Sequence, residues 1–294
     1  MFMSYLFLFI ITILYLIFLL KYPLILQQTS LNSFSFFIKV MIPSIIPMYI
    51  LSNLILYNKV TQRIMSFFKL FFNRFDNSFS ISLFIINILV GNPTGIINII
   101  KAHKEHLISD DDASILVKCC SFINPLFIMS FTSLYNMRRF GLFIIVINII
   151  SNYIIMLFYK KKKMNFKIEN IKIDIISLIT NSSHIILNIF AIFYFINIIK
   201  TPLEVYKAPN FIVLILDFLE LSSGLNHIIT CNLNLYIKMM IMLFLVSTTG
   251  LSIILQSISE IKKAPNYRCL IKNYISGRIY QMIIVFLFFI IFIN

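Results

Sequence analysis

The sequence contains no tryptophan and little charge. Only 12% of its 294 residues are Asp, Glu, Lys or Arg, whereas charged residues make up about a quarter of an ordinary soluble domain. A soluble fold is excluded, because a chain of this length cannot bury the 60% of its residues that are hydrophobic. The apolar residues occur in runs of about 20, the helix length that crosses roughly 30 Å of hydrocarbon. We therefore predict an all-α polytopic protein of the inner membrane.

Cysteine pairs and catalytic motifs are also absent. The four cysteines, Cys119, Cys120, Cys231 and Cys269, include no CxxC pair, so neither a zinc site nor a disulfide framework is indicated. We interpret them as small, buried apolar residues. The sequence has no P-loop, Rossmann fingerprint, HExxH motif or serine elbow. We expect no enzymatic activity, no metal and no cofactor.

The formal charge is +14, which in a soluble protein would suggest a nucleic-acid partner. Here the basic residues lie between the apolar runs, where they set the membrane topology and contact anionic lipids. The expected partner is therefore the lipid bilayer and not nucleic acid.

The chain divides into four segments. Residues 1–33 are predicted to form an N-terminal transmembrane helix and a loop, and residues 160–172 a basic cytoplasmic linker. The linker separates a first half, 34–159, from a second half, 173–294. The first apolar run, Phe2 to Leu20, lacks a basic start and a cleavage site, so we expect it to be retained as a helix.

Both halves show the same order of apolar segments. Each is predicted to contain a crossing, a re-entrant hairpin of half-membrane length, a broken crossing and a final crossing. In the first half these cover residues 34–57, 80–106, 109–131 and 141–159, and in the second half 173–199, 211–224, 235–261 and 270–293. Two consecutive copies with three passes each must be inverted in the membrane. The prediction is about seven crossings, with two re-entrant hairpins and broken helices in an inverted repeat.

The basic residues give an independent orientation. In this scheme most of them fall on one face, which is cytoplasmic by the positive-inside rule. These are Lys59, Arg63, Lys69, Arg74, Lys101, Lys104, the 160–172 cluster, Lys262, Lys263, Arg268 and Lys272. The amino terminus is then cytoplasmic and the carboxyl terminus is outside. We also expect residues 62–76 to form an amphipathic helix that lies flat on the membrane, with Phe75 on its apolar face.

The polar breaks are the candidate site. Unpaired backbone at membrane depth survives only where protein or a water-filled cavity covers it, and helix ends there suit a polar or charged solute. The candidate pathway residues are Gly91, Asn92, Pro93, Thr94, Gly95, Asn124, Pro125, Glu220, Ser222, Ser223, Gly224, Thr248, Thr249, Gly250, Ser252 and Gln256. The alternative is that the breaks are packing kinks, at which neighbouring helices approach closely.

Glu220 is the most specific of these candidates. A carboxylate at membrane depth is costly unless it is paired or hydrated, so it indicates an ion or proton site. We expect Leu221 to Gly224 to leave the helix, and the hydroxyls of Thr248, Thr249 and Ser252 to be the partners of the carboxylate. The alternative is an interfacial carboxylate that reaches water.

Several segments resemble a known family. They are PSIIP at 43–47, GNPTG at 91–95, SDDDASILVKCCSFINPLFI at 109–128, FLELSSGL at 218–225 and GLSIILQSIS at 250–259, followed by Tyr274 and Arg278. In this order they resemble the YlbJ-type sporulation integral membrane proteins of the nucleoside-recognition, or Gate, group. The family usually has a glycine pair where Thr249 and Gly250 stand. The resemblance implies a multi-pass membrane protein of a spore-former, located in the mother-cell-derived membrane around the forespore.

Two functions remain open. One is a permease-like transporter that moves an unidentified small solute through a site between the halves. The other is a scaffold that has lost transport and recruits partners through its basic loops. Other sporulation membrane proteins and a second copy of the chain are the protein partners to be considered.

Overall fold

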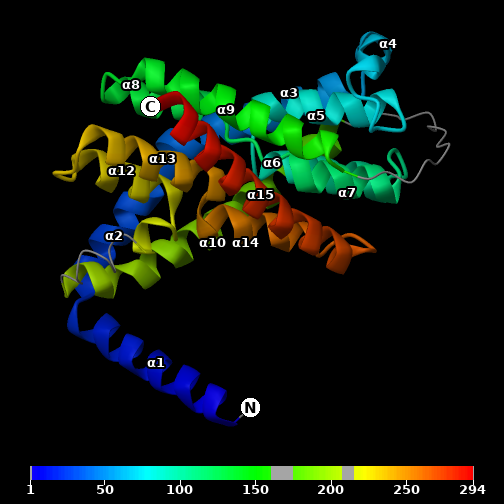
Figure 1. Ribbon diagram of the computed structural model, residues 1–294. Helices are drawn as coiled ribbons and strands as arrows, with labels where there is room; N and C mark the ends of the chain where they lie inside the picture. Colours follow the sequence, from blue (N-terminus) through cyan, green and yellow to red (C-terminus); the bar gives the residue numbers. More distant parts are fainter. Residues whose placement is uncertain (1, 160–174, 207–214, 294) are drawn as a thin grey trace.

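The computed structural model describes residues 2–159, 175–206 and 215–293, and all regular elements in these residues are helical (Figure 1). The basic linker, 160–172, and residues 211–214 of the second hairpin lie outside the described residues. In chain order the elements are α1 (Phe2–Lys21), α2 (Pro23–Phe36), η1 (Phe37–Met41), α3 (Ile42–Leu56), α4 (Lys59–Phe67), η2 (Phe68–Leu70), α5 (Ser78–Val90), α6 (Thr94–Lys104), α7 (Asp110–Cys119), α8 (Pro125–Leu134), α9 (Arg138–Leu157), α10 (Ile175–Val205), α12 (Leu221–Thr230), α13 (Leu235–Thr248), α14 (Gly250–Ile261) and α15 (Tyr267–Ile293).

Several of these elements are long and apolar enough to cross a membrane. Within the described ranges there are four such spans, Arg138–Leu157, Leu178–Val205, Leu235–Ile261 and Tyr267–Ile291. A fifth is formed if α1 and α2 are counted as one bent span. The prediction of an all-helical chain with several apolar spans is therefore confirmed.

The amino-terminal region differs from the prediction of one helix followed by a loop. The segments Thr12–Lys21 and Pro23–Lys39 are both helical and meet at an angle of 96°. The loop expected up to residue 33 is therefore wrong, because Pro23 starts a new helix with its fixed φ and needs no intrahelical donor there. Figure 1 shows α1 extending away from the other helices. It contacts α10 through the Tyr15 hydroxyl, which donates to the Ile198 carbonyl at 2.7 Å.

The helix that follows α2 is continuous through a π-helical turn, η1, into α3. Pro43 lies in the first turn of α3 and Pro47 lies inside that helix. Pro43 has no N–H to donate to the carbonyl of Lys39, so the regular bonding pattern is interrupted within η1. The PSIIP sequence therefore accounts for the irregularity in this turn.

The predicted amphipathic segment after α3 is helical over a shorter range than expected. Its helix, α4, begins at the Asn58 cap, whose side chain accepts from the Val60 N–H at 2.9 Å. Phe67, Leu70 and Phe71 are strongly exposed, whereas Phe75 is only 1% exposed and packs in the core. The expectation that Phe75 belongs to a lipid-facing surface is wrong, because the chain turns after η2 and brings it inward.

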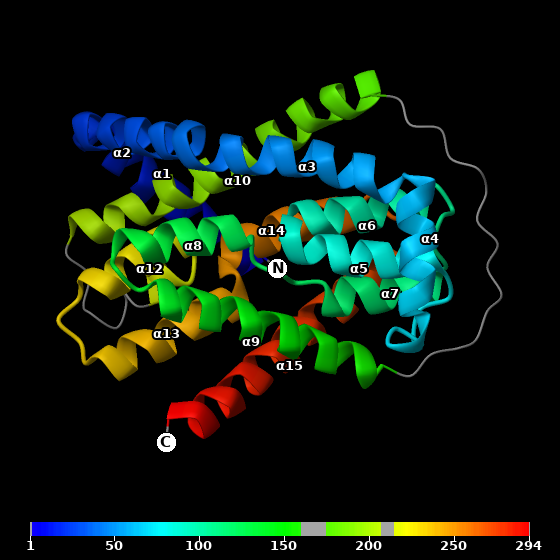
Figure 2. The ribbon, with the colours of Figure 1, turned by 90° about the horizontal axis from the view of Figure 1, so that it is seen from above.

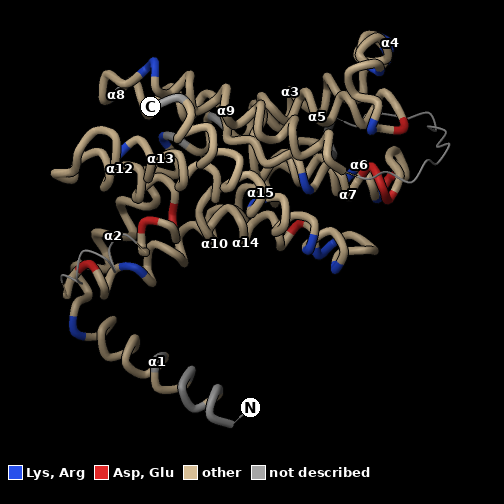
Figure 3. Tube along the Cα trace, in the orientation of Figure 1, with Lys and Arg blue, Asp and Glu red and all other residues tan. Residues whose placement is uncertain are grey.

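The two hairpin regions lie at opposite ends of the bundle. Figure 2 shows α5, α6 and α7 at one end and α8, α12 and α13 at the other. The broken pairs α7–α8 and α13–α14 each run from one end towards the other. Figure 3 marks basic residues of α4, α6 and the α14–α15 turn at the end that holds α5 to α7. These basic segments, remote in sequence, therefore share one end of the molecule.

The core has two large apolar clusters that match this division. One is built from α5, α6 and α7, and the other from α12 and α13 with α8 and α9. Helix α15 contributes to both. Gly277 allows α15 to approach α7 closely, since a Cβ at this position would lie 2.0 Å from the Lys118 carbonyl oxygen.

Candidate functional site

The tip of the first hairpin docks on the break between α7 and α8. Gly91 ends α5 with φ 71° and ψ 176°, a conformation open essentially to glycine alone. A Cβ on Gly91 would lie 2.4 Å from the Asn124 backbone nitrogen. The next residue, Asn92, donates its backbone N–H to the Phe122 carbonyl at 2.8 Å. The glycine of GNPTG is therefore required both for the turn and for the contact.

The first break spans residues 120–124 and restarts as α8 through a capped end. The Asn124 side chain accepts from the backbone N–H groups of Leu126 and Phe127, at 2.9 and 3.3 Å. Pro125 follows in the first turn, where its missing N–H costs nothing. The predicted break at Asn124 and Pro125 is confirmed as a helix start.

Side chains from α9 and α15 satisfy the carbonyls that this break exposes. Arg278 donates to the carbonyls of Ser121 and Lys118, at 3.4 and 3.5 Å, and is only 4% exposed. Asn152 and Gln281 also donate to the Ser121 carbonyl, at 3.2 and 3.5 Å. A buried cation at the carboxyl end of a helix is favourable because the free carbonyls carry partial negative charge.

The second hairpin ends differently from the prediction. Leu221 to Gly224 were expected to leave the helix, but they form the first turn of α12, and Glu220 is its amino-terminal cap. The carboxylate accepts from the Ser222 N–H at 3.0 Å, the Ser222 hydroxyl at 2.9 Å and the Ser223 N–H at 2.7 Å. The positive end of the helix dipole thus stabilises this buried charge.

The second break also contacts its hairpin through backbone atoms, but with donor and acceptor exchanged. Thr249 is left-handed, with φ 63°, and Gly250 has φ 72°. The next two N–H groups, of Leu251 and Ser252, donate to the carbonyls of Phe218 and Leu219 in the hairpin, at 2.8 and 3.0 Å. In both halves, therefore, the hairpin tip is hydrogen-bonded through backbone atoms to the break of the following helix.

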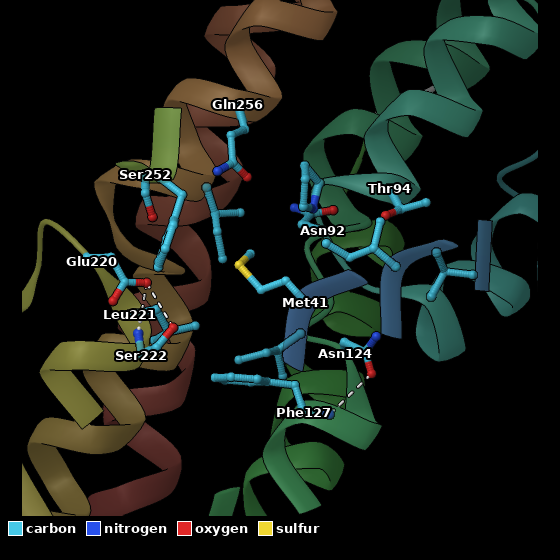
Figure 4. Close-up of a pocket in the computed structure, with 16 residues that line it drawn as sticks. Met41, Asn92, Thr94, Asn124, Phe127, Glu220, Leu221, Ser222, Ser252 and Gln256 are labelled. Carbon is cyan, nitrogen blue, oxygen red and sulfur yellow. Dashed lines mark hydrogen bonds between the residues drawn. The ribbon is translucent and has the colours of Figure 1, made fainter. Parts of the chain in front are cut away.

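Each hairpin and the break that it contacts form one unit, and the two units meet at one cavity of about 60 Å³. Figure 4 shows Glu220, Ser222, Ser252 and Gln256 on one side of it, and Asn92, Thr94 and Asn124 on the other, with Met41 between them. Eight of the sequence-predicted residues line it: Asn92, Pro93, Thr94, Asn124, Glu220, Ser222, Ser252 and Gln256. Apolar residues complete the wall, namely Met41, Ile45, Val90, Ile123, Phe127, Phe193, Leu221 and Ile253.

The other predicted residues support the cavity from behind. Gly91 and Gly250 allow the two tip-to-break contacts, and Gly95 and Gly224 allow close packing on Asn87 and Asp217. Pro125 begins α8, and the Ser223 N–H binds Glu220. The hydroxyls of Thr248 and Thr249 donate to the carbonyls of Leu245 and Thr248, at 2.9 and 2.6 Å. These two hydroxyls were expected to bind Glu220, and their bonds to the local backbone replace that contact.

The chemistry of the cavity is set by hydrogen-bond acceptors. Glu220 is the sole ionisable group among its lining residues in the described chain and is 3% exposed. Gln256, 1% exposed, donates its amide nitrogen to the Ile189 carbonyl at 3.3 Å, which leaves the amide oxygen buried without a partner. A buried acceptor without a donor is costly, so the site suits a ligand that carries a donor or a positive charge.

Lys200 is a polar residue of this region that the sequence reasoning did not select. It is 3% exposed, and its ammonium donates to the Ser223 hydroxyl at 2.6 Å. It also lies 4.0 Å from Glu204. The one sequence signal is its position directly after the apolar run 173–199. A lysine there is usually assigned to the lipid headgroups, and only the packing of α10 beside α12 gives it a buried partner.

A second, wider pocket of about 440 Å³ lies further along the same helices. It is lined by Tyr49, Ile97, Ile100, Lys101, Lys104, Glu105, Asn181, His184, Ile185, Glu260 and Lys263. Burial lowers the pKa of Lys101, an effect that nearby Glu105 partly offsets. Burial and a 2.7 Å hydrogen bond to Glu105 raise the pKa of Tyr57 beside it. Because its lining includes Lys101, Lys104, Glu105, Glu260 and Lys263, this pocket lies at the charged end of the molecule, and we call it the vestibule.

An apolar cluster lies between the vestibule and the central cavity. Ile45 lines the cavity, Ile97 and Ile185 line the vestibule, and all three pack in one cluster with Tyr49 and Ile189. Residues of one apolar cluster therefore line both spaces.

No family model, curated protein or solved structure matches this chain.

Proposed function

We propose that this protein is a permease-like transporter that carries a small polar solute across the membrane between two inverted halves. The observation that supports it is the shared cavity, which takes residues from both hairpin tips and both helix breaks. A set of unrelated packing kinks would have no reason to place their polar residues around one space.

The inverted repeat is part of this proposal. Its support is that each hairpin is bonded to the following break through backbone atoms. The Asn92 N–H of the first hairpin donates to Phe122 in its break, and the Leu251 N–H after the second break donates to Phe218 in its hairpin. The hairpins also lie at opposite ends of the bundle, as Figure 2 shows. Related units that point in opposite directions are the arrangement from which alternating access is built.

The proposed topology has seven crossings: α1, α2 with α3, α7 with α8, α9, α10, α13 with α14, and α15. The amino terminus is then cytoplasmic and the carboxyl terminus outside. The grouping of basic residues at one end supports this orientation. Reporter fusions at Lys162 and at the carboxyl terminus test it, and both reporters on the same side would contradict it.

The size of the cavity bounds the solute in this conformation. A volume of about 60 Å³ holds an ion or a few waters. A larger solute requires the halves to separate. The apolar cluster of Ile45, Ile97 and Ile185 is the proposed cytoplasmic gate, because it separates the cavity from the vestibule.

The resemblance of the five motifs supports a role in sporulation, with the protein in the membrane around the forespore. A scaffold of the same fold is the competing function. The two differ in whether the cavity is needed: transport requires Glu220, whereas a scaffold requires the basic end.

The test is Glu220→Gln in a sporulating host, with Glu204→Gln as the matched control because the Glu204 side chain is 57% exposed. Both variants should accumulate to the wild-type level, since glutamine can still cap a helix. We expect a lower yield of mature spores from Glu220→Gln alone, together with an altered metabolite distribution between mother cell and forespore. A normal spore yield from Glu220→Gln would favour the scaffold.

A further inference from the structure

Three reactive side chains lie in line at the far end of α12, outside the central cavity. The Nδ1 atom of His227 is 2.7 Å from a carboxylate oxygen of Asp217. Its Nε2 atom is 3.2 Å from the sulfur of Cys231. The order is thus carboxylate, imidazole, thiol, which is the arrangement that activates a nucleophile.

The local fold explains why these residues meet. His227 and Cys231 are four residues apart, so they lie on one face of α12, and Cys231 is its carboxyl-terminal cap. Gly224 brings α12 against the preceding segment, since a Cβ there would lie 2.4 Å from the Asp217 carbonyl oxygen. Asp217 is therefore buried, at 2% exposed, beside a histidine whose side chain is 40% exposed.

The bonding order defines the role of each group. A carboxylate only accepts, so the imidazole directs its N–H from Nδ1 to Asp217. The lone pair of Nε2 then faces the sulfur and can take the thiol proton. Cys231 is partly exposed and precedes exposed residues 232–234, so a reagent can reach the sulfur from water.

We propose that Cys231 is a reactive thiol that undergoes exchange with disulfides. His227 takes the thiol proton, and the thiolate attacks one sulfur of the incoming disulfide. A mixed disulfide to Cys231 forms, the original sulfur–sulfur bond breaks, and the displaced thiolate receives the proton from His227. Cys231 is oxidised and the incoming disulfide is reduced, so no further reagent is required. This site does not depend on the proposed transport function.

Other charges surround the group and enter its pH dependence. Lys200 and Glu204 of α10 act electrostatically on Asp217, the lysine favouring the carboxylate and the glutamate opposing it. Lys238 of α13 donates to the Ile229 carbonyl at 2.7 Å, close along α12 to Cys231. A neutral disulfide is therefore the appropriate probe, because these charges neither attract nor repel it.

The experiment treats the purified full-length protein in detergent with dithiodipyridine at neutral pH and follows each cysteine by peptide mass spectrometry. Cys269 is exposed and serves as the internal control, and Cys119 and Cys120 are buried. We expect Cys231 to form its mixed disulfide at least about tenfold faster than Cys269, although Cys231 is less exposed. A rate equal to or below that of Cys269 would overturn the proposal.

Two variants test the roles of the neighbours. His227→Asn should slow the reaction of Cys231 about tenfold and leave that of Cys269 unchanged. His184→Asn, an exposed histidine elsewhere, is the matched control and should change neither rate. Asp217 is a positioning residue, so Asp217→Asn should alter the pH profile of the Cys231 rate. Unchanged Cys231 rates and profiles in both variants would refute the activation, and the wild-type rate ratio decides the matter if a variant misfolds.

Discussion

The two hairpin-and-break units invite direct comparison. In the first unit the glycine of the contact, Gly91, lies at the hairpin tip and faces the backbone of Asn124 in the break. In the second unit the glycine, Gly250, lies in the break and faces the backbone of Leu221 beside the tip. Each contact thus includes one glycine, which belongs to the hairpin in the first unit and to the break in the second. What the halves share is an approach of two backbones, and either side can supply the space.

The charges of the two units also differ. The first break is stabilised by a cation, Arg278, which binds the carbonyls at the end of α7. The second unit contains an anion, Glu220, which caps the start of α12. Both charges complement a helix end, but only Glu220 lines the central cavity. The two units therefore both make a backbone contact but differ in charge, which gives the cavity an acidic wall on one side.

The largest effect is expected from a substitution at Gly91, which disrupts the contact between the first hairpin tip and its break. Gly91→Ala places a Cβ against backbone atoms and forces alanine into a glycine-only conformation, and the two terms together should cost at least about 4 kcal/mol of unfolding free energy. In Gly250→Ala the new Cβ lies 3.0 Å from the Leu221 backbone nitrogen, so the loss of unfolding free energy should be about 1–2 kcal/mol. Denaturation of both variants in mixed detergent micelles measures the difference. Equal losses would show that the contacts are equally tight.

A smaller effect is expected from removing the positive charge of Arg278. Arg278→Met removes one of three donors to the Ser121 carbonyl and the donor to the Lys118 carbonyl. It should cost about 2 kcal/mol, because the Lys118 acceptor is left unsatisfied. Arg268→Met, at an exposed position, is the control and should change stability by less than about 0.5 kcal/mol. Unfolding in mixed micelles again gives the values. A stable Arg278→Met protein would mean that Asn152 and Gln281 suffice for the break.

The smallest effect is expected at the second break, from a substitution at Thr249. Thr249 is a β-branched residue with positive φ, which is strained. Thr249→Gly relieves the strain but adds flexibility to the unfolded chain, so we expect a net gain of up to about 1 kcal/mol. The midpoint of thermal denaturation should rise slightly, whereas Thr248→Gly, inside α13, should lower it. A decrease for both would show that Thr249 is not strained.

Local signals in the sequence predicted many of the elements correctly. At Ser109, an S-x-x-D sequence of the kind that starts helices forms a cap, with the Ser109 hydroxyl accepting from the Asp112 N–H at 3.1 Å. The breaks at Asn124 and at Gly250 were also placed correctly. These features depend on a few neighbouring residues, through missing donors, short polar side chains or positive φ. Such causes can be read without knowledge of the rest of the fold.

The partners of the polar residues could not be predicted in this way. Lys200 binds Ser223 across 23 residues, and Arg278 binds Ser121 across 157. Glu220 was recognised as a buried carboxylate, but its bonds to Ser222 and Ser223 depend on α12 starting one residue later. Phe75 likewise turns from a predicted lipid-facing residue into a core residue.

The sequence by itself thus determined that this chain is helical with several long apolar spans, where its helices break and which polar residues stand at the breaks. Apolar run length, proline, glycine and capping residues act over a few positions and suffice for that. Only the tertiary structure decided that the breaks of both halves surround one cavity, and which charges complement which helix ends. Those outcomes depend on how helices far apart in the chain pack, because buried acceptors and charges take their partners from whichever helix lies alongside.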